Sequence, residues 1–289
     1  MKLITYCYKD GAPQLGAIKD EHIVNLAANS GGKIPNDMRT FLAMGDAGMD
    51  LARSTVDDAM GSVALDQVKL LAPITNPTKV LAIGLNYMDH VRETGIDVPK
   101  LATMFCKFPS SIIGPGDAIM WREDVTAQVD YEAELAFVIG KTARYVPEAD
   151  AFDYIAGYMN CHDVSARDLQ MAPGDQWIRG KSLDTFCPLG PFLATKDEIA
   201  DPHNLSITCT LNGETMQNSN TKELIFKIPY LIKYLSKAFT LLPGDVVITG
   251  TPDGVGAFRK PPIWLKDGDS VTVEVEGLGQ LTNPCVIEK

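Results

Sequence analysis

The chain has 289 residues, of which 45% are hydrophobic and 22% are charged, and its formal net charge is −11. The apolar fraction is that of a folded globular protein and excludes wholesale disorder. An acidic chain is a poor partner for the phosphate backbone of nucleic acid, and no apolar run approaches the length of a membrane span. We therefore expect no nucleic-acid or membrane partner, and we ask whether part of the negative charge binds a cation.

The N-terminal residues lack the continuous apolar segment of a secretory signal peptide, which favours a cytosolic location. The six cysteines are scattered along the chain and none forms a Cys-x-x-Cys motif. This spacing is typical of reduced, structural thiols rather than of a disulfide framework.

The first 72 residues are expected to form a small N-terminal α+β domain. Prolines at 73 and 77, with polar residues between them, predict a linker to a second domain over 73–289. In the first domain, hydrophobic patterning predicts strands over 3–8, 14–18 and 23–26 and a helix over 38–52.

The second domain is predicted to be rich in strands. Strands do not alternate regularly with helices, which disfavours a doubly wound sheet and favours a mainly β, α+β domain. The expected strands cover 79–84, 131–139, 205–211, 246–249 and 271–275. The expected helices cover 147–154, parts of 162–171 and 228–238.

Two acidic residues, Glu132 and Glu134, share one face of the predicted strand over 131–139. Their Cα atoms would lie about 7 Å apart, and like charges that close repel unless a cation lies between them. A strand end emerging into solvent is the commoner explanation for two such residues alone. Asp163, among apolar and small residues, adds a third carboxylate, and the set is plausible as a Mg²⁺ or Mn²⁺ site.

A short helix is expected between Asn86, which can cap it, and Gly95, which can end it. His90 and Glu93 are then three residues apart on one face. A carboxylate beside an imidazole orients the ring and raises its basicity, as a general base toward water requires. An ordinary surface ion pair is the alternative. Such a short helix is marginal alone, which suits a lid that closes over substrate.

The glycine-rich segment 249–256 lacks the Gly-Lys-Ser/Thr ending of a phosphate-binding loop. It can still present N–H groups and the Thr251 hydroxyl to a carboxylate, or it can be a simple turn. Arg167 and Lys181 add positive charge that can neutralise an anionic substrate.

Taken in order, these motifs resemble the fumarylacetoacetate hydrolase family, in its acylpyruvase-like branch. The resemblance extends over most of the second domain and is carried by Gly84–Tyr87, Asp130–Leu135, Asp163–Gln170, Gly180–Ser182, Pro188–Pro191, Asn212–Glu214 and Gly250–Gly256. It implies metal ligation by Glu132, Glu134 and Asp163, and a lid dyad of His90 and Glu93. It further implies substrate contacts from Arg167, Gln170, Lys181 and Thr251.

The resemblance also implies a mixed β-sandwich roll, a homodimer, and bound Mg²⁺ or Mn²⁺. Our leading hypothesis is a hydrolase that cleaves a C–C bond in a 2,4-dioxo acid, an acylpyruvate such as maleylpyruvate, fumarylpyruvate or a diketo-deoxy sugar acid. His90 would activate water, and Lys181 would stabilise the departing pyruvate enolate. Alternatives on the same site are oxaloacetate decarboxylation and a keto–enol isomerisation of the 2-hydroxyhepta-2,4-diene-1,7-dioate type. A protein that only binds metal and small dicarboxylates is a further alternative.

Overall fold

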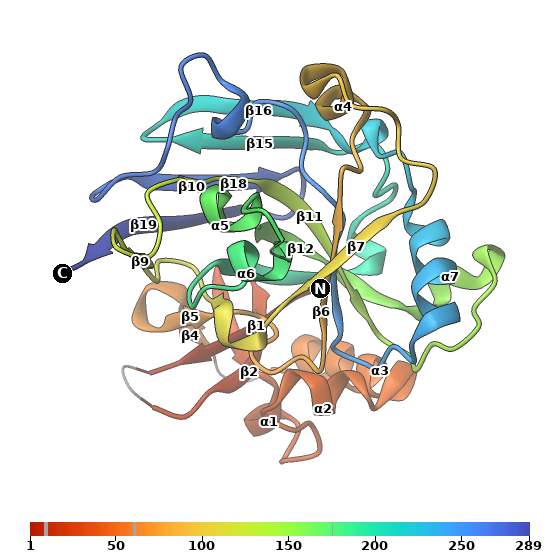
Figure 1. The fold of residues 1–289 in the computed structure, drawn as a ribbon. Helices are drawn as coiled ribbons and strands as arrows, with labels where there is room; N and C mark the ends of the chain where they lie inside the picture. Colours follow the sequence, from red (N-terminus) through yellow and green to blue (C-terminus); the bar gives the residue numbers. More distant parts are fainter. Residues whose placement is uncertain (9–10, 60–61, 175) are drawn as a thin grey trace.

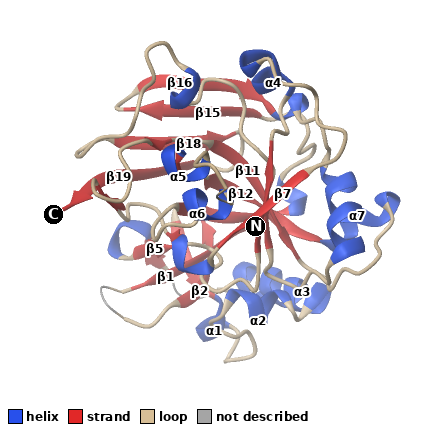
Figure 2. Ribbon diagram, in the orientation of Figure 1, coloured by secondary structure: helices blue, strands red, loops and turns tan. Residues whose placement is uncertain are grey.

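The computed structural model describes residues 1–8, 11–59, 62–174 and 176–289. Its strands form a 12-stranded sheet, a five-stranded sheet and a two-stranded ribbon. In space, the helices lie around these sheets (Figure 2). No helix in the described ranges is long and apolar enough to cross a membrane.

The N-terminal segment supplies one end of the large sheet and a group of helices. Its elements are β1 (Lys2–Cys7), β2 (Gln14–Lys19), β3 (His22–Asn25), β4 (Val63–Ala64), β5 (Lys69–Leu71), α1 (Leu26–Asn29), α2 (Met38–Leu42) and α3 (Gly45–Asp57). The single helix predicted over 38–52 is wrong, because the chain breaks between α2 and α3. Gly45 adopts a positive φ of 63° at the break, a conformation that interrupts a right-handed helix.

The large sheet continues from the N-terminal strands into the rest of the chain. Its path is β4-β3-β2-β1-β14-β12-β11-β17-β6-β7, with β5 beside β1 and β8 beside β14. The further strands are β6 (Val80–Gly84), β7 (Thr103–Lys107), β8 (Ile112–Ile113), β11 (Ala133–Ile139), β12 (Ile155–His162), β14 (Cys187–Thr195) and β17 (Val246–Ile248). Because β1 pairs directly with β14, one sheet spans the expected boundary, and the division into domains 1–72 and 73–289 stays a prediction.

A second sheet covers the centre of the first. It runs β16 (Glu214–Asn220), β15 (Ser206–Leu211), β18 (Ser270–Val275), β19 (Gln280–Glu288), β9 (Ile119–Arg122), and it packs against β11, β12 and β14 (Figure 1). The pairs β17–β6, β14–β8 and β19–β9 are parallel, whereas β11–β12 and β15–β18 are antiparallel. The predicted fold class, α+β and mainly β with a mixed β-sandwich, is confirmed.

The helices of the second half are α4 (Met88–Thr94), α5 (Arg167–Gln170), α6 (Trp177–Lys181) and α7 (Ile228–Ala238). The prediction for α7 is correct, and Leu231, Ile232 and Leu235 form its buried stripe. The segment 148–154 is a 3₁₀ helix rather than an α-helix. Residues up to His162 belong to β12, so only α5 is helical in the segment 162–171.

Strand β11 is buried along its whole length and faces two different cores. Leu135 and Phe137 pack in the core beneath the five-stranded sheet, whereas Ala136 and Val138 pack toward the N-terminal helices. This alternation is the two-faced pattern expected from the sequence. The strand begins at Ala133, so Glu132 lies just before it. Val129–Asp130 form a separate strand, β10, paired with β13 (Ser165–Ala166).

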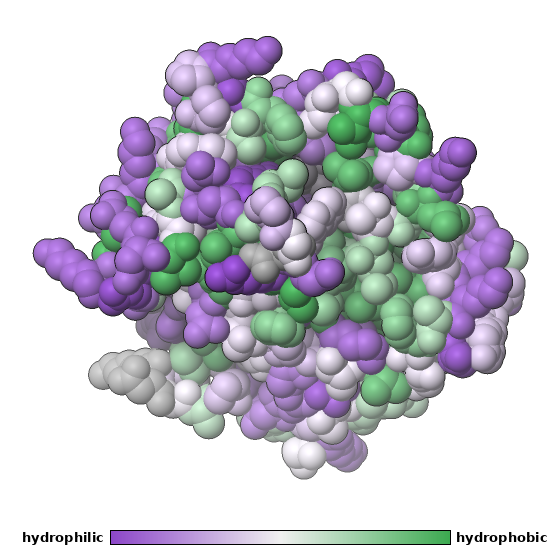
Figure 3. Space-filling view, viewed as in Figure 1, coloured by the Kyte–Doolittle hydropathy of each residue, from purple (hydrophilic) through white to green (hydrophobic). Residues whose placement is uncertain are grey.

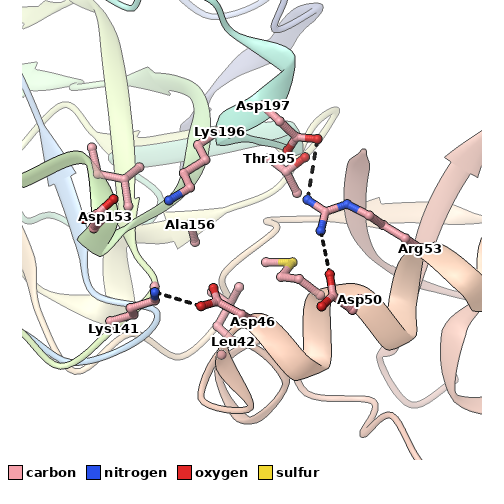
Figure 4. A pocket seen from close by; sticks show the side chains of 14 residues that line it. Leu42, Asp46, Asp50, Arg53, Lys141, Asp153, Ala156, Thr195, Lys196 and Asp197 are labelled. Atoms are coloured by element: carbon pink, nitrogen blue, oxygen red, sulfur yellow. Dashed lines mark hydrogen bonds and ion pairs between the residues drawn. The ribbon is translucent and has the colours of Figure 1, made fainter.

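A cavity of about 260 Å³ lies between helix α3 and the segments that follow β11 and β14, and we call it the seam cavity (Figure 4). Ion pairs line it: Lys141 lies 2.9 Å from Asp46, and Arg53 lies 3.2 Å from Asp50 and 3.5 Å from Asp197. These side chains are mostly exposed to solvent. They join the N-terminal helices to the loops that follow β11 and β14.

Candidate metal and active site

Three carboxylates converge where β11 begins and β12 ends. Glu132, Glu134 and Asp163 each place an oxygen within 4.8 Å of the other two, and all three are buried. The strands are antiparallel, so the end of one lies beside the start of the other. The Asp163 N–H donates to the Glu132 carbonyl at 3.0 Å, which fixes the two segments together.

Three cations surround these acids. Lys181 Nζ lies 2.5 Å from Glu132 and 2.8 Å from Asp163, and Arg167 lies 2.6 Å from Glu132. Lys107, at the end of β7, lies 2.5 Å from the other Asp163 oxygen and is 1% exposed. Lys107 was missed from the sequence, since no strand was predicted over 103–107 to carry it into the site.

The cations neutralise the acids unequally. Burial alone would raise the pKa of Glu132, but Lys181 and Arg167 outweigh it and lower the pKa to about 2. The pKa of Glu134 is raised well above its usual value by burial and by the neighbouring charges of Asp163 and Glu132. A divalent cation beside Glu134 would offset the repulsion from Asp163 and Glu132 and favour the ionised carboxylate. Three hard oxygen donors therefore fit Mg²⁺ or Mn²⁺.

Arg167 donates hydrogen bonds to three other side chains. Its Nε donates to Asp130 at 2.8 Å, one terminal nitrogen donates to Glu132, and the other donates to Gln170 Oε1 at 2.9 Å. Arg167 therefore holds Glu132 and fixes which way the Gln170 amide points. Because Gln170 Oε1 is an acceptor here, its NH₂ group is left to donate elsewhere. Direct substrate binding by Arg167 stays a prediction.

The predicted lid helix is α4, and its dyad is assembled. His90 Nδ1 lies 3.0 Å from Glu93 Oε2, and His90 is only 6% exposed, so the pair is not an ordinary surface ion pair. Gly95 ends the helix with a φ of 70°, as expected. The predicted cap at Asn86 is wrong: Tyr87 is the N-cap residue, and the buried Asn86 amide instead binds the Phe226 N–H and the Thr249 carbonyl.

Helix α4 is held against its neighbours by three contacts. Arg92 lies 2.8 Å from Glu223, Asp89 is hydrogen-bonded to Ser219 on β16, and the His90 ring packs edge-on against Phe258.

The glycine-rich loop after β17 joins these parts together. Glu134 accepts a hydrogen bond from Gly250 N, Glu93 accepts one from Gly254 N at 3.0 Å, and Asp130 accepts one from Gly256 N at 2.7 Å. The loop thus contacts a triad acid, the lid dyad and the partner of Arg167. Gly250 has a φ of 103°, and a Cβ there would lie 2.9 Å from Asn86, so a side chain is excluded.

A cavity of about 310 Å³ opens over the triad. Most of the predicted site residues line it, namely His90, Glu132, Glu134, Asp163, Arg167, Gln170, Lys181 and Thr251, while Glu93 lies behind His90. The remaining wall is largely apolar and includes Phe105, Trp177 and Phe258. The sequence brought these positions together through the family resemblance. Their individual roles stay predictions.

Two buried polar atoms near the triad have no hydrogen-bond partner among the described residues, Tyr87 Oη and His162 Nε2. Burial raises the pKa of Tyr87 and lowers the pKa of His162 to about 3, so both groups are neutral.

Comparison with known proteins identifies the family. The model of the fumarylacetoacetate hydrolase C-terminal domain matches residues 79–286, which is most of the chain. The chain therefore belongs to the fumarylacetoacetate hydrolase family, as the motifs predicted. This is a family of enzymes, and the chain carries a buried acidic triad.

Individual relatives cover nearly the whole chain. The mitochondrial oxaloacetate tautomerase of Xenopus laevis is 49% identical over 290 residues, covering 99% of this chain and 90% of that protein. A putative HpcE protein from Mycobacterium smegmatis is 36% identical with a TM-score of 0.92, and each chain is covered completely. Maleylpyruvate hydrolase from Sphingobium sp. SYK-6, solved with manganese(II) and pyruvate, is 28% identical with a TM-score of 0.82 and complete coverage.

The cytosolic location expected from the sequence is wrong by this comparison. The tautomerase relatives from Xenopus laevis, Rattus norvegicus, Bos taurus and Homo sapiens are all named as mitochondrial. The expectation depended on the lack of an apolar secretory signal, and that criterion is blind to mitochondrial targeting, which uses amphipathic, Arg-rich segments.

Proposed function

We propose that this protein is a divalent-metal-dependent enzyme that interconverts the enol and keto forms of oxaloacetate. The observation that carries the proposal is 49% identity with an oxaloacetate tautomerase over 99% of the chain. The maleylpyruvate hydrolase structures are only 28–29% identical. The keto–enol alternative is therefore better supported than the acylpyruvate hydrolase that was our leading hypothesis.

The geometry suits a small dianion with a 2-oxo group. Mg²⁺ or Mn²⁺, held by Glu132, Glu134 and Asp163, would draw electron density from the substrate's carboxylate and 2-oxo oxygens. Burial lowers the pKa of Lys181, but Asp163 and Glu132 outweigh burial and raise it, so this side chain stays charged. Its ammonium group lies on the cavity wall and offsets negative charge that develops on the enolate oxygen.

Tautomerisation moves one proton. In the ketonising direction the enol O–H bond breaks, a C–H bond forms at C3, and the C2 oxygen becomes a carbonyl. His90 lines the cavity with Nδ1 held by Glu93, which leaves Nε2 to carry the proton to and from C3. No attacking water and no C–C cleavage is needed, so the same residues serve without a hydrolytic step.

The test follows products as well as substrate. Loss of enol-oxaloacetate absorbance, measured with Mn²⁺ present, should be accelerated by the protein without matching release of pyruvate. Pyruvate released with CO₂ would instead identify a decarboxylase. Pyruvate released from an acylpyruvate, with ¹⁸O from labelled water in the second acid, would identify the hydrolase and overturn the proposal.

We also propose that the protein forms a homodimer. Strand β7 ends the described path of the large sheet, with β6 as its partner. Three large apolar side chains in and beside it are exposed: Leu101 (63% exposed), Met104 (37%) and Phe108 (52%). Apolar side chains also gather over the middle and right of the face in Figure 3. Light scattering should give about 63 kDa, twice the 31.4 kDa of one chain, and Leu101→Asp should lower it toward one chain.

A further inference from the structure

Gln217 lies outside the cavity, yet it contacts two parts of the site. It belongs to β16, is 1% exposed, and its side-chain amide is fully hydrogen-bonded. Its Oε1 accepts from the backbone N–H of Ala133 at 2.9 Å. Its Nε2 donates to Thr251 Oγ1 at 2.8 Å and to the Pro252 carbonyl at 3.0 Å.

The chemistry of these partners fixes the orientation of the amide. A backbone N–H can only donate, so the amide atom that faces Ala133 must be the oxygen. The NH₂ group must then face Thr251, and the threonine oxygen accepts. A hydroxyl that accepts one hydrogen bond still has its own hydrogen to donate. Among the described residues Gln217 is the partner found for this hydroxyl, and Thr251 lines the cavity.

We propose that Gln217 is a positioning residue that makes Thr251 a hydrogen-bond donor to a substrate carboxylate. Ala133, whose N–H donates to Gln217 Oε1, lies between the triad acids Glu132 and Glu134. The Gln217 side chain thus fixes the position of the Thr251 hydroxyl relative to Ala133, the first residue of β11. The inference rests on the proposed function in one respect, that the ligand is a small oxo-acid dianion.

A purely structural brace would use the same bonds, and one substitution separates the two roles. Gln217→Glu keeps the acceptor for Ala133 N–H and the size of the side chain, but in its ionised form it has no hydrogen to donate. The Thr251 hydroxyl would then donate to the new carboxylate and turn its hydrogen away from the ligand. A brace predicts a change in stability alone, whereas a positioning role predicts weaker ligand binding.

The experiment measures oxalate binding to the Mn²⁺-loaded protein by calorimetry. Oxalate is a planar dianion that resembles the enolate end of the proposed substrate, and its binding requires no turnover. We expect Gln217→Glu and Thr251→Val each to weaken binding about tenfold, as loss of one hydrogen bond to a charged group would. The double variant should bind like Thr251→Val alone, since the residues act through one hydrogen bond.

The matched control is Gln67→Glu, which adds the same charge at an exposed position and should bind oxalate like the parent protein. Thr251→Ser keeps the hydroxyl and should lose less affinity than Thr251→Val. Parental affinity in Gln217→Glu, or losses that multiply in the double variant, would overturn the proposal even if oxaloacetate is the substrate. A non-additive result would uphold it even if oxaloacetate is not turned over. If Gln217→Glu does not fold, equal affinity of Thr251→Val and Thr251→Ser still overturns it.

Discussion

Two cavities in this protein are lined by similar ion pairs and differ mainly in burial. The seam cavity joins Lys141 to Asp46 and Arg53 to Asp197 through side chains that are 43–80% exposed to water. Beside the cavity over the triad, Lys107 and Lys181 pair with Asp163 through side chains at most 2% exposed. Water screens the first set, so each of those ion pairs contributes little to the stability of the fold.

In the buried set, by contrast, no charge is independent. The pKa of Glu132 falls to about 2 and that of Glu134 rises, although both are glutamates two residues apart. The difference is which cations each one contacts. Burial therefore turns common residue types into a site in which one carboxylate, Glu134, lacks a cationic partner, and the proposed metal would supply one.

The largest expected contrast is in activity. Asp163→Asn removes a triad acid and the partner of two buried lysines, so tautomerisation of oxaloacetate should fall by about 10³-fold. Asp50→Asn in the seam cavity should leave the rate unchanged. Initial rates of enol loss measure both. A comparable loss in the two variants would show that burial does not set the active cavity apart.

The lid dyad gives the next test. His90→Ala should lower turnover by about 10²-fold, because the proton carrier is lost. Stabilisation by Mn²⁺ should persist, since His90 is not one of the triad acids. Turnover by stopped-flow absorbance and melting with Mn²⁺ separate these effects, and unchanged turnover would remove His90 from the mechanism.

Stability should show the contrast without any assay of function. Lys107→Met leaves the buried Asp163 short of a partner and should cost about 3–5 kcal/mol. For a chain of this size that lowers Tm by about 10 °C. The matched change Lys141→Met at the seam should leave Tm unchanged, because that pair is exposed. Calorimetric melting measures Tm for both variants. An equal fall in Tm would contradict the claim that the buried ion pair matters more than the exposed one.

Metal addition should have the smallest effect of the four. Mn²⁺ at about one hundred times its Kd should stabilise the folded protein by about 2.7 kcal/mol. Glu134→Gln should abolish this stabilisation while the metal-free variant melts no lower than the parent, because repulsion within the triad is relieved. Melting curves with and without Mn²⁺ test this, and a full Mn²⁺ shift in the variant would remove Glu134 from the metal site.

The sequence predicted the parts of the site that local patterning or recognisable motifs carry. The Glu132–Glu134 pair, the His90–Glu93 spacing and helix α7 depend on residues close together in the chain, and the fold class follows from the density of strands. Asp163 is distant in the chain and joined the triad through the family motifs. Lys107 and Gln217 were missed because each reaches the site through strand pairing with distant segments. Neither strand order nor the register of β7 against β6 can be read from one segment alone.

Two local predictions failed for different physical reasons. The predicted cap at Asn86 was locally reasonable, but Phe226 and Thr249, which are remote in sequence, bind that amide instead. The helix predicted over 38–52 had suitable periodicity, but the backbone freedom of Gly45 allowed a break. In both places a local preference was overridden by another part of the chain or by a single residue.

The most direct test of the central claim is the metal dependence of enol-oxaloacetate ketonisation. The rate should be measured in chelator-treated protein, then during titration with Mn²⁺, for the parent chain and for Glu132→Gln. We predict that the chelated protein is inactive, that Mn²⁺ restores the rate saturably, and that Glu132→Gln remains inactive at the same Mn²⁺ concentrations. Full activity in the chelated protein, or full restoration in Glu132→Gln, would contradict a metal-dependent tautomerase built on this buried triad.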